Sequence, residues 1–194
     1  DDLAGGDGAD TLQGGAGNDT LDGGDGDDTI LLGGADEATG GAGDDVFTLD
    51  PTDPAANIDI TLDGGSDGTD GFPAGPENGD AGDILDLSGV TAPVIVDFGP
   101  NPEAGTVNGL DADAATDITF AEIEQVLTGA GNDTIAGEDA TGPIELDTGD
   151  GDDEIATGTG DDTIAAGAGD DVVDAGNGDD VVDAGDGDDA VDGG

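Results

Sequence analysis

Large aliphatic residues recur every nine positions in two parts of the chain. The first part reads GGDGADTLQ, GGAGNDTLD and GGDGDDTIL from residue 5, and GGAGDDVFT from residue 40. The second part reads TGAGNDTIA from residue 128 and then, from residue 148, TGDGDDEIA, TGTGDDTIA, AGAGDDVVD, AGNGDDVVD and AGDGDDAVD. The consensus is G-G-x-G-x-D-x-U-x, where U is a large aliphatic residue. A short fixed period of this kind predicts a solenoid whose units stack on their neighbours.

Within each unit, positions 7 to 9 have the alternation of a short strand, and only position 8 is dependably apolar. We expect the position-8 side chains to face the core: Leu12, Leu21, Ile30, Phe47, Ile135, Ile155, Ile164, Val173, Val182 and Val191. Positions 1 to 5 are rich in glycine, so they are predicted to form a turn rather than a helix or a paired strand.

Residues 49–127 lose the period. Short strand-like runs occur at 58–62, 84–87, 94–98, 118–120 and 123–127. Residues 121–127 could form one helical turn, but a strand is favoured. The segment NGDAGDILD at 78–86 resembles a degenerate copy of the repeat, with Asp83 at position 6. We therefore expect three regions: a repeat block at 1–48, an irregular β-rich interruption at 49–127, and a second repeat block at 128–194.

Composition narrows the chemistry. The 194 residues include 51 Asp and Glu but no Lys, Arg, His or Cys, which gives a formal charge of −51. A chain without cations does not bind nucleic acid phosphates and is repelled by anionic membrane surfaces. Its apolar runs fall far short of the roughly 20 residues that membrane insertion as a helix requires. Serine–histidine and cysteine–histidine catalysis and His- or Cys-ligated zinc are excluded. The remaining donors are hard oxygens, which suit calcium or magnesium.

The repeat closely resembles the calcium-binding nonapeptide of the RTX (repeats-in-toxin, hemolysin-type) family. In that family the first six residues form a calcium-binding turn and the last three form a strand. Two nonapeptides make one coil of a right-handed parallel β-roll, with calcium between stacked turns. The resemblance therefore implies an all-β fold, a right-handed parallel β-roll (β-solenoid) interrupted by a β-rich insertion.

The resemblance also implies the calcium ligands. The position-6 carboxylates are Asp1, Asp10, Asp19, Asp28, Asp45, Asp83, Asp133, Asp153, Asp162, Asp171, Asp180 and Asp189. Backbone carbonyls at the glycine positions should complete each shell, among them those of Gly5, Gly14, Gly23 and Gly40. Residues 18 apart should share an ion: Asp1 with Asp19, Asp10 with Asp28, Asp153 with Asp171, Asp162 with Asp180, and Asp171 with Asp189. The expected number is roughly five to ten Ca²⁺ ions. Thr or Ala at position 1 of the second block departs from the family pattern.

Energetics favour folding that depends on calcium. Each unit buries one dependable aliphatic side chain, worth about 1.5–3 kcal/mol. Ordering the backbone of a unit costs roughly 1–2 kcal/mol for each of its nine residues. Carboxylates held a few ångströms apart also repel one another by on the order of 4 kcal/mol at an effective dielectric of 20. A dication between them reverses the sign of that interaction, so calcium binding is predicted to drive folding.

The favoured function is a secreted calcium-binding structural module, not an enzyme, that folds outside the cell and suits type I secretion of an unfolded chain. Asp1 falls at position 6 and the chain stops at positions 1 and 2 of a further unit. These ends favour a piece of a longer solenoid, or copies that stack end to end into a surface layer or filament. One alternative is the calcium-folding tail of a larger extracellular enzyme or toxin. Another, a carboxylate-only enzyme in residues 49–127, has no supporting pattern. The position-5 acids are expected on the turn surface, with an outer ligand role left open.

Overall fold

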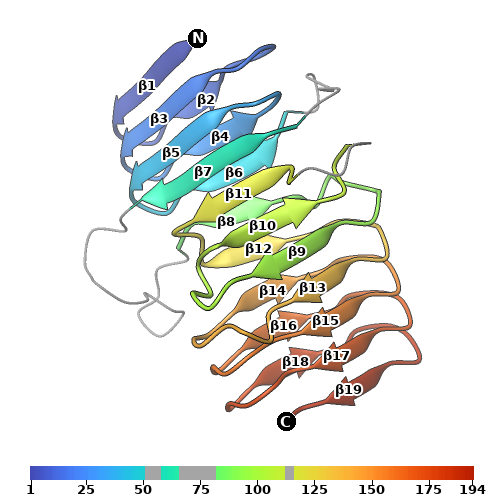
Figure 1. Cartoon of the computed structure of the whole chain (residues 1–194). Helices are drawn as coiled ribbons and strands as arrows, with labels where there is room; N and C mark the ends of the chain where they lie inside the picture. The colour runs from blue at the N-terminus through green and yellow to red at the C-terminus, as the bar shows by residue number, and fades with distance from the viewer. Residues whose placement is uncertain (51–57, 66–81, 112–115) are drawn as a thin grey trace.

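The strands stack into two long sheets that run from one end of the chain to the other (Figure 1). The computed structural model describes residues 1–50, 58–65, 82–111 and 116–194. These described ranges contain strands, turns and bends and no helix. Accordingly, none of them includes a helix able to span a membrane. The architecture is an all-β roll of stacked, mostly parallel strands, as the repeat predicts.

Sheet A holds, in spatial order, β1 (Asp2–Asp7), β3 (Thr20–Asp25), β5 (Glu37–Ala42), β7 (Ile60–Gly65), β11 (Ile118–Ala121), β10 (Gly105–Asn108), β9 (Ile95–Phe98), β13 (Thr134–Ala136), β15 (Glu154–Ala156), β17 (Val172–Asp174) and β19 (Ala190–Asp192). Sheet B holds β18 (Val181–Asp183), β16 (Thr163–Ala165), β14 (Glu145–Asp147), β12 (Gln125–Leu127), β8 (Ile84–Asp86), β6 (Val46–Leu49), β4 (Thr29–Leu32) and β2 (Thr11–Gln13). In the repeat blocks the chain alternates between the sheets, so two units make one coil.

The core forms as the alternation predicts, because the position-8 side chains point between the sheets. Ile30, Phe47 and Ile155 are at most 1% exposed, and they belong to one continuous hydrophobic cluster. Glu154 and Ala156 flank Ile155 on the same strand and lie outside this cluster. Val182 is only partly buried and Val191, in β19, is 48% exposed, so burial declines in the last coil.

The glycine positions in sheet A of the first block correct one expectation. Strands β1, β3, β5 and β7 do not stop at position 9 but continue through the glycines. Gly24 pairs with Gly6 on one side and with Gly41 on the other. Glycine at these positions has a positive φ, for example +109° at Gly24. Adjacent coils stack in register there, and backbone pairing therefore extends along the start of the turn.

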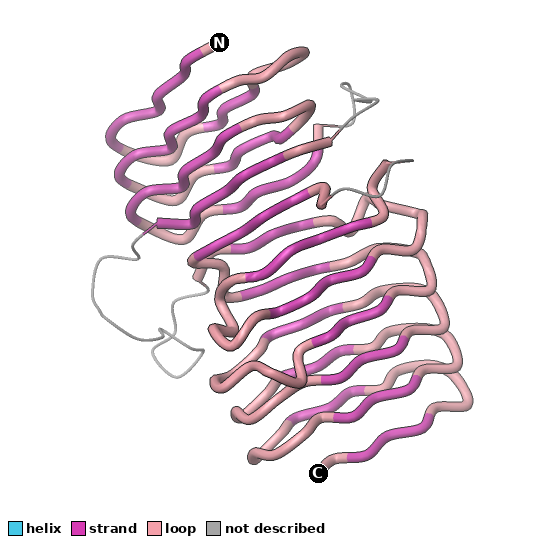
Figure 2. The backbone as a smooth tube through the Cα atoms, viewed as in Figure 1, coloured by secondary structure: helices cyan, strands magenta, loops and turns pink. Residues whose placement is uncertain are grey.

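The interruption completes both sheets instead of separating them. The runs expected at 58–62, 84–87, 94–98, 118–120 and 123–127 correspond to β7, β8, β9, β11 and β12, and residues 125–127 form a strand rather than a helical turn. Strand β10 was not anticipated from the sequence. It pairs antiparallel with both β11 and β9 (Figure 1), in a molecule whose other strand pairs are parallel within the described residues. Figure 2 shows the strands of this middle region continuing the stack between the two repeat blocks. Phe98 and Phe120 pack edge to face beside it, with ring centroids 5.8 Å apart.

Candidate metal centre

Position 6 places a carboxylate on the inward side of each coil, two residues before the core aliphatic residue. Asp28 is 1% exposed, and its Oδ1 accepts the backbone N–H of Asp10 from the previous coil at 2.7 Å. Asp153 is 2% exposed, and its Oδ1 accepts the N–H of Asp133 at 2.7 Å. Each such hydrogen bond links the side chain of one coil to the backbone of the coil before it. We call a run of these linked residues a carboxylate ladder.

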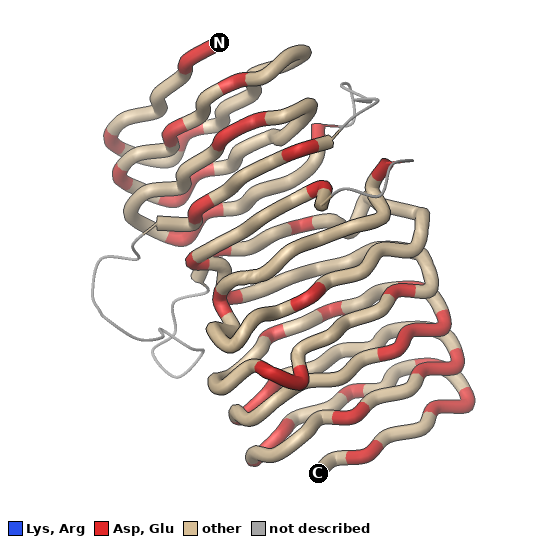
Figure 3. The backbone as a smooth tube through the Cα atoms, viewed as in Figure 1, with Lys and Arg blue, Asp and Glu red and all other residues tan. Residues whose placement is uncertain are grey.

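Four carboxylate ladders follow from the hydrogen bonds. They are Asp10–Asp28–Asp45–Asp83–Glu124, Asp1–Asp19–Asp36, Asp133–Asp153–Asp171–Asp189 and Asp162–Asp180. In the Asp1–Asp19 rung the donor is the N-terminal ammonium group. All five pairs expected from the 18-residue spacing therefore lie on adjacent coils. Figure 3 shows the acidic residues recurring from coil to coil along the roll.

The second oxygen has no hydrogen bond in eight of these carboxylates. The Oδ2 atoms concerned are buried and without a hydrogen bond in Asp19, Asp28, Asp45, Asp133, Asp153, Asp162, Asp171 and Asp180. An unpaired buried carboxylate oxygen is costly, since desolvating it is not repaid by any donor. Rows of such atoms are a natural place for cations.

Glycine at position 1 leaves room beside each orphaned oxygen in the first block. A Cβ added to Gly5 would lie 2.6 Å from the carbonyl oxygen of Gly23 and 2.8 Å from Oδ2 of Asp10. A Cβ on Gly23 would collide with the corresponding pair, the Gly40 carbonyl oxygen and Oδ2 of Asp28. A carbonyl oxygen of one coil and a carboxylate oxygen of the other thus border the same small space. Such a set of hard oxygens fits calcium.

Threonine changes this arrangement in the second block. The hydroxyl of Thr148 donates to the carbonyl oxygen of Ala166 at 2.9 Å, and that of Thr157 donates to Ala175 at 3.0 Å. The position-1 carbonyl, which only borders space in the glycine coils, accepts a side-chain hydrogen bond here. The hydroxyls also lie beside Asp153 and Asp162, respectively, where they favour the ionised carboxylate. Thr at position 1 is thus accommodated without strain in the turn.

Burial without a counter-charge shifts the acids towards protonation. Burial raises the pKa of Asp45 from 3.8 to about 6, an effect that the hydrogen bond with Asp28 opposes and that the charges of Asp28, Asp27 and Asp44 reinforce. Burial likewise raises the pKa of Asp153, Asp162 and Asp171. The ionised ladder is therefore electrostatically unfavourable unless a cation lies within it.

Comparison with protein families gives the same answer as the geometry. The model of the RTX calcium-binding nonapeptide repeat (4 copies) matches residues 1–30, 32–50, 120–140, 147–182 and 172–194, which is more than half of the chain. The chain belongs to the RTX repeat family. It is accordingly a calcium-binding β-roll module. No curated protein matches it.

Two ladder residues escaped the sequence analysis. Asp36 lies in GGADEAT at residues 33–39, an RTX unit shortened by two residues, in which Ala38 occupies the core position. The oxygens of Asp36 accept the N–H groups of Asp19 and Gly33. Glu124 ends the longest ladder by accepting the N–H of Asp83. A search for the repeat that allowed shortened turns would have found Asp36, but Glu124 has no local signal.

The RTX ladders supply few carboxylates to any one point. Among the residues that the structure describes, no group of three or more acidic side chains converges on a common position. The position-5 acids lie on the outside, where Asp152 accepts the N–H of Asp170 and Asp161 accepts that of Asp179, both at 2.9 Å. The oxygens available to an ion in a ladder are thus the carboxylates of adjacent coils together with main-chain carbonyls.

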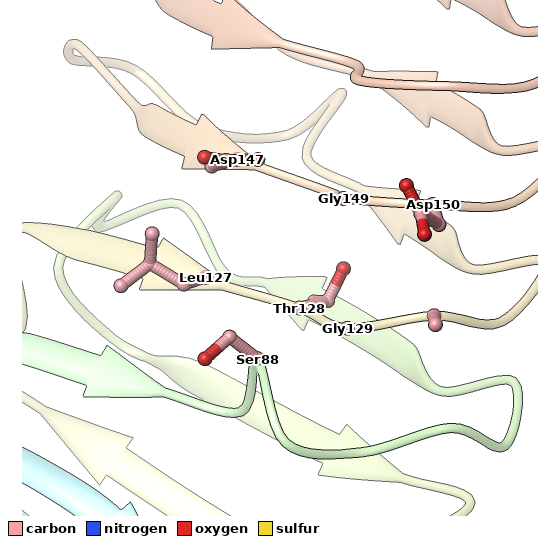
Figure 4. Close-up of a pocket in the computed structure, with 8 residues that line it drawn as sticks. Ser88, Leu127, Thr128, Gly129, Asp147, Gly149 and Asp150 are labelled. Atoms are coloured by element: carbon pink, nitrogen blue, oxygen red, sulfur yellow. The ribbon is translucent and has the colours of Figure 1, made fainter.

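A hollow of about 260 Å³ opens on the turn surface where the second block begins. Figure 4 shows Ser88, Thr128, Gly129 and Asp150 around it. Its acids are Asp147 at position 9 and Asp150 at position 3, so the carboxylates of the ladders do not line it. The hollow thus borders turn residues of stacked coils, including Thr128 at position 1, without including a position-6 carboxylate.

Proposed function

We propose that this RTX chain is a secreted structural module that folds when calcium binds along its carboxylate ladders outside the cell. The observation that carries the proposal is the row of buried Oδ2 atoms without a partner. The proposed ligands are the twelve position-6 aspartates predicted from the sequence, with Asp36 and Glu124 added. Position-1 carbonyl oxygens, such as those of Gly5, Gly14, Gly23 and Gly40, supply further donors.

Calcium would supply charge neutralisation, and the chain supplies only oxygen ligands. The two oxygens of Asp28 have different roles in this proposal. Its Oδ1 is fixed by the N–H of Asp10, while its Oδ2 borders the space beside Gly23. The hydrogen bond thereby orients the carboxylate before an ion binds. At free calcium ten times Kd, each independent site adds about 1.4 kcal/mol to stability.

Folding outside the cell follows from the concentration of calcium there. Sites with dissociation constants of about 10⁻⁴–10⁻³ M are typical of extracellular calcium modules and would be empty in a cytosol. RTX repeats are typically found in secreted proteins, which supports this assignment. The proposed role is structural, because most ladder carboxylates are buried between stacked coils and the chain has no His, Cys or Lys to complete the commoner catalytic sets.

Two finer hypotheses from the sequence stay predictions. End-to-end stacking of copies would appear as filaments or sheets by electron microscopy in millimolar calcium, and monodisperse monomers would contradict it. The role of a calcium-folding tail would require a catalytic or toxin domain in the same polypeptide. Both depend on the same calcium chemistry as the main proposal.

A calcium titration followed by far-UV circular dichroism tests the proposed function. We expect a large gain of β-sheet signal as calcium is added to the chain in chelator. Magnesium at the same concentrations is the control and should produce little change, because it demands compact octahedral geometry and dehydrates reluctantly. An unchanged spectrum after complete removal of calcium would show that folding does not depend on the ion.

A further inference from the structure

Aliphatic residues replace the position-6 acids in the middle of the roll. Strand register identifies the replacements, since Leu62 pairs with the core residue Ala38 and therefore places Ile60 level with Asp36. Ile118 pairs with Ile60 in turn. The same register places Val94 level with Asp133, and Ile144 level with Asp162. Sheet A thus passes from acid to aliphatic and back to acid at position 6.

These replacements enlarge the core at the centre. In β7 both Ile60 and Leu62 are buried, and in β11 both Ile118 and Phe120 are buried, each at most 2% exposed. Strand β3 of the first block instead presents one aliphatic residue, Leu21, preceded at position 6 by Asp19. Each additional buried Ile or Val stabilises the fold by removing apolar surface from water. The central strands gain this stabilisation in place of a carboxylate that needs a counter-ion.

Two further features stabilise the central strands. Strand β10 joins β9 and β11 through antiparallel pairing, and Val107 of β10 is fully buried between Val96 and Ile118. The edge-to-face contact of Phe98 with Phe120 adds a favourable aromatic interaction to the stabilisation from their buried area. Across the core, sheet B contributes the buried residues Leu85, Val126 and Leu146. These side chains are all apolar, and the proposed ligands next to them are Asp83 and Glu124, which precede β8 and β12 in sheet B.

We propose that β7, β11, β10 and β9, packed on β8, β12 and β14, form a central core that stays folded without calcium and on which the RTX coils of both blocks assemble when calcium binds. The dependence of the flanking coils on calcium rests on the proposed function. The independence of the central core rests on its own apolar residues.

The central core already presents the groups on which the ladders begin or end. The N–H of Val94 donates to Oδ1 of Asp133 at 2.8 Å, and the N–H of Ile144 donates to Oδ1 of Asp162 at 2.8 Å. On the other side, the N–H of Thr61 donates to the carbonyl oxygen of Asp36 at 3.0 Å. In a solenoid the first ordered unit is the costly one and further units add by nearest-neighbour contacts. A preformed centre removes that cost for both blocks.

Amide hydrogen exchange on the full chain, resolved by residue with NMR, tests the proposal. In chelator we expect amides of β9, β10 and β11 to be protected on the order of 100-fold or more, while those of β3, β15 and β17 exchange as in an unfolded chain. With calcium, all of these strands should be protected. Protection nowhere in chelator but everywhere in calcium would overturn the central core and leave calcium-dependent folding intact. Protection everywhere in both conditions would instead overturn calcium-dependent folding, and the division of the molecule with it.

A pair of variants tests whether buried aliphatic side chains keep the central core folded in chelator. Ile118→Asp restores an acid at position 6 in the centre and should abolish protection of β9, β10 and β11 in chelator. Ile95→Asp is the matched control, because it adds the same charge to β9, another strand of the core, where the side chain is 49% exposed. It should leave the protection within a few-fold of the unmodified chain. Equal effects of the two substitutions would overturn the assignment, and the unmodified chain carries the test if Ile118→Asp does not fold in calcium.

Discussion

At the scale of the residue, the two oxygens of a ladder carboxylate such as Asp153 or Asp171 have separate roles. One oxygen accepts a backbone N–H from the previous coil, and this hydrogen bond fixes the orientation of the side chain. The other oxygen is buried and unpartnered, so it is the one available to a cation. The backbone therefore organises the site before any ion arrives, which reduces the ordering that binding must impose.

Replacing Asp153 by Asn separates the two roles. An amide keeps an oxygen to accept the N–H of Asp133 but offers an NH₂ group, with no negative charge, where Oδ2 stood. We expect Asp153→Asn to weaken calcium binding and to remove about 1.4 kcal/mol of stability at calcium ten times Kd. Isothermal titration calorimetry and the calcium midpoint of folding would measure this loss.

The control for this substitution is Asp152→Asn, which removes the same charge from the neighbouring, exposed position 5. It should shift the calcium midpoint much less than Asp153→Asn does. Equal shifts would mean that general charge reduction, rather than a ligand, explains the effect, and would count against the ladder as the binding site.

At the scale of the element, the turn depends on the absence of a side chain at position 1 of the first block. The φ of Gly23 lies outside the left-handed region, so its backbone tolerates alanine, but the added Cβ would meet Oδ2 of Asp28 and the carbonyl oxygen of Gly40. We expect Gly23→Ala to cost about 1–3 kcal/mol through overpacking. The same substitution should raise the calcium concentration needed for folding, as measured by circular dichroism.

Gly89→Ala provides the comparison, because a Cβ there has no atom within 4 Å and its φ is not in the left-handed region. Its calcium midpoint and thermal stability should match those of the unmodified chain. If Gly23→Ala behaves like Gly89→Ala, the space beside the glycine does not take part in binding.

The elements differ in how far the sequence could predict them. The nine-residue period located Ile30 and Ile155 in the core and paired Asp10 with Asp28, because the coil there has a constant length. Asp36 was missed because its own unit, residues 33–39, has seven residues instead of nine and lacks the regular glycine spacing before the aspartate. Strand β10 was missed because its pairing with β9 and β11 is a tertiary contact rather than a periodic pattern.

At the scale of the whole molecule, acidic groups dominate, and pH acts on them together. The pKa of Asp45 lies at about 6 in the folded chain without calcium, above its ordinary value of 3.8, because the group is buried. Between these two values the folded state holds the proton and the unfolded state does not. Asp153, Asp162 and Asp171 shift in the same direction for the same reason.

Acidification should therefore stabilise the folded chain when calcium is absent. Stability rises as pH falls wherever the folded state binds more protons, so it should increase as the pH drops through about 6 towards about 4. In calcium the effect reverses, since protons compete with the ion for the same carboxylates. Thermal melting at a series of pH values, in chelator and in calcium, would measure both trends, and a loss of structure below neutral pH in chelator would contradict the first.

The carboxylate ladders have a direction, and this has a consequence for how such a protein can change in length. A ladder can begin on a coil that contributes only an N–H, as Val94 and Ile144 do, whereas it ends on an acid, such as Asp36 or Glu124. Only the added unit must therefore carry an aspartate, because the coil before it contributes a backbone N–H and no particular side chain. Tandem duplication of a gene segment downstream of an unrelated strand would then yield a working array at once, without any matching mutation in the host sequence.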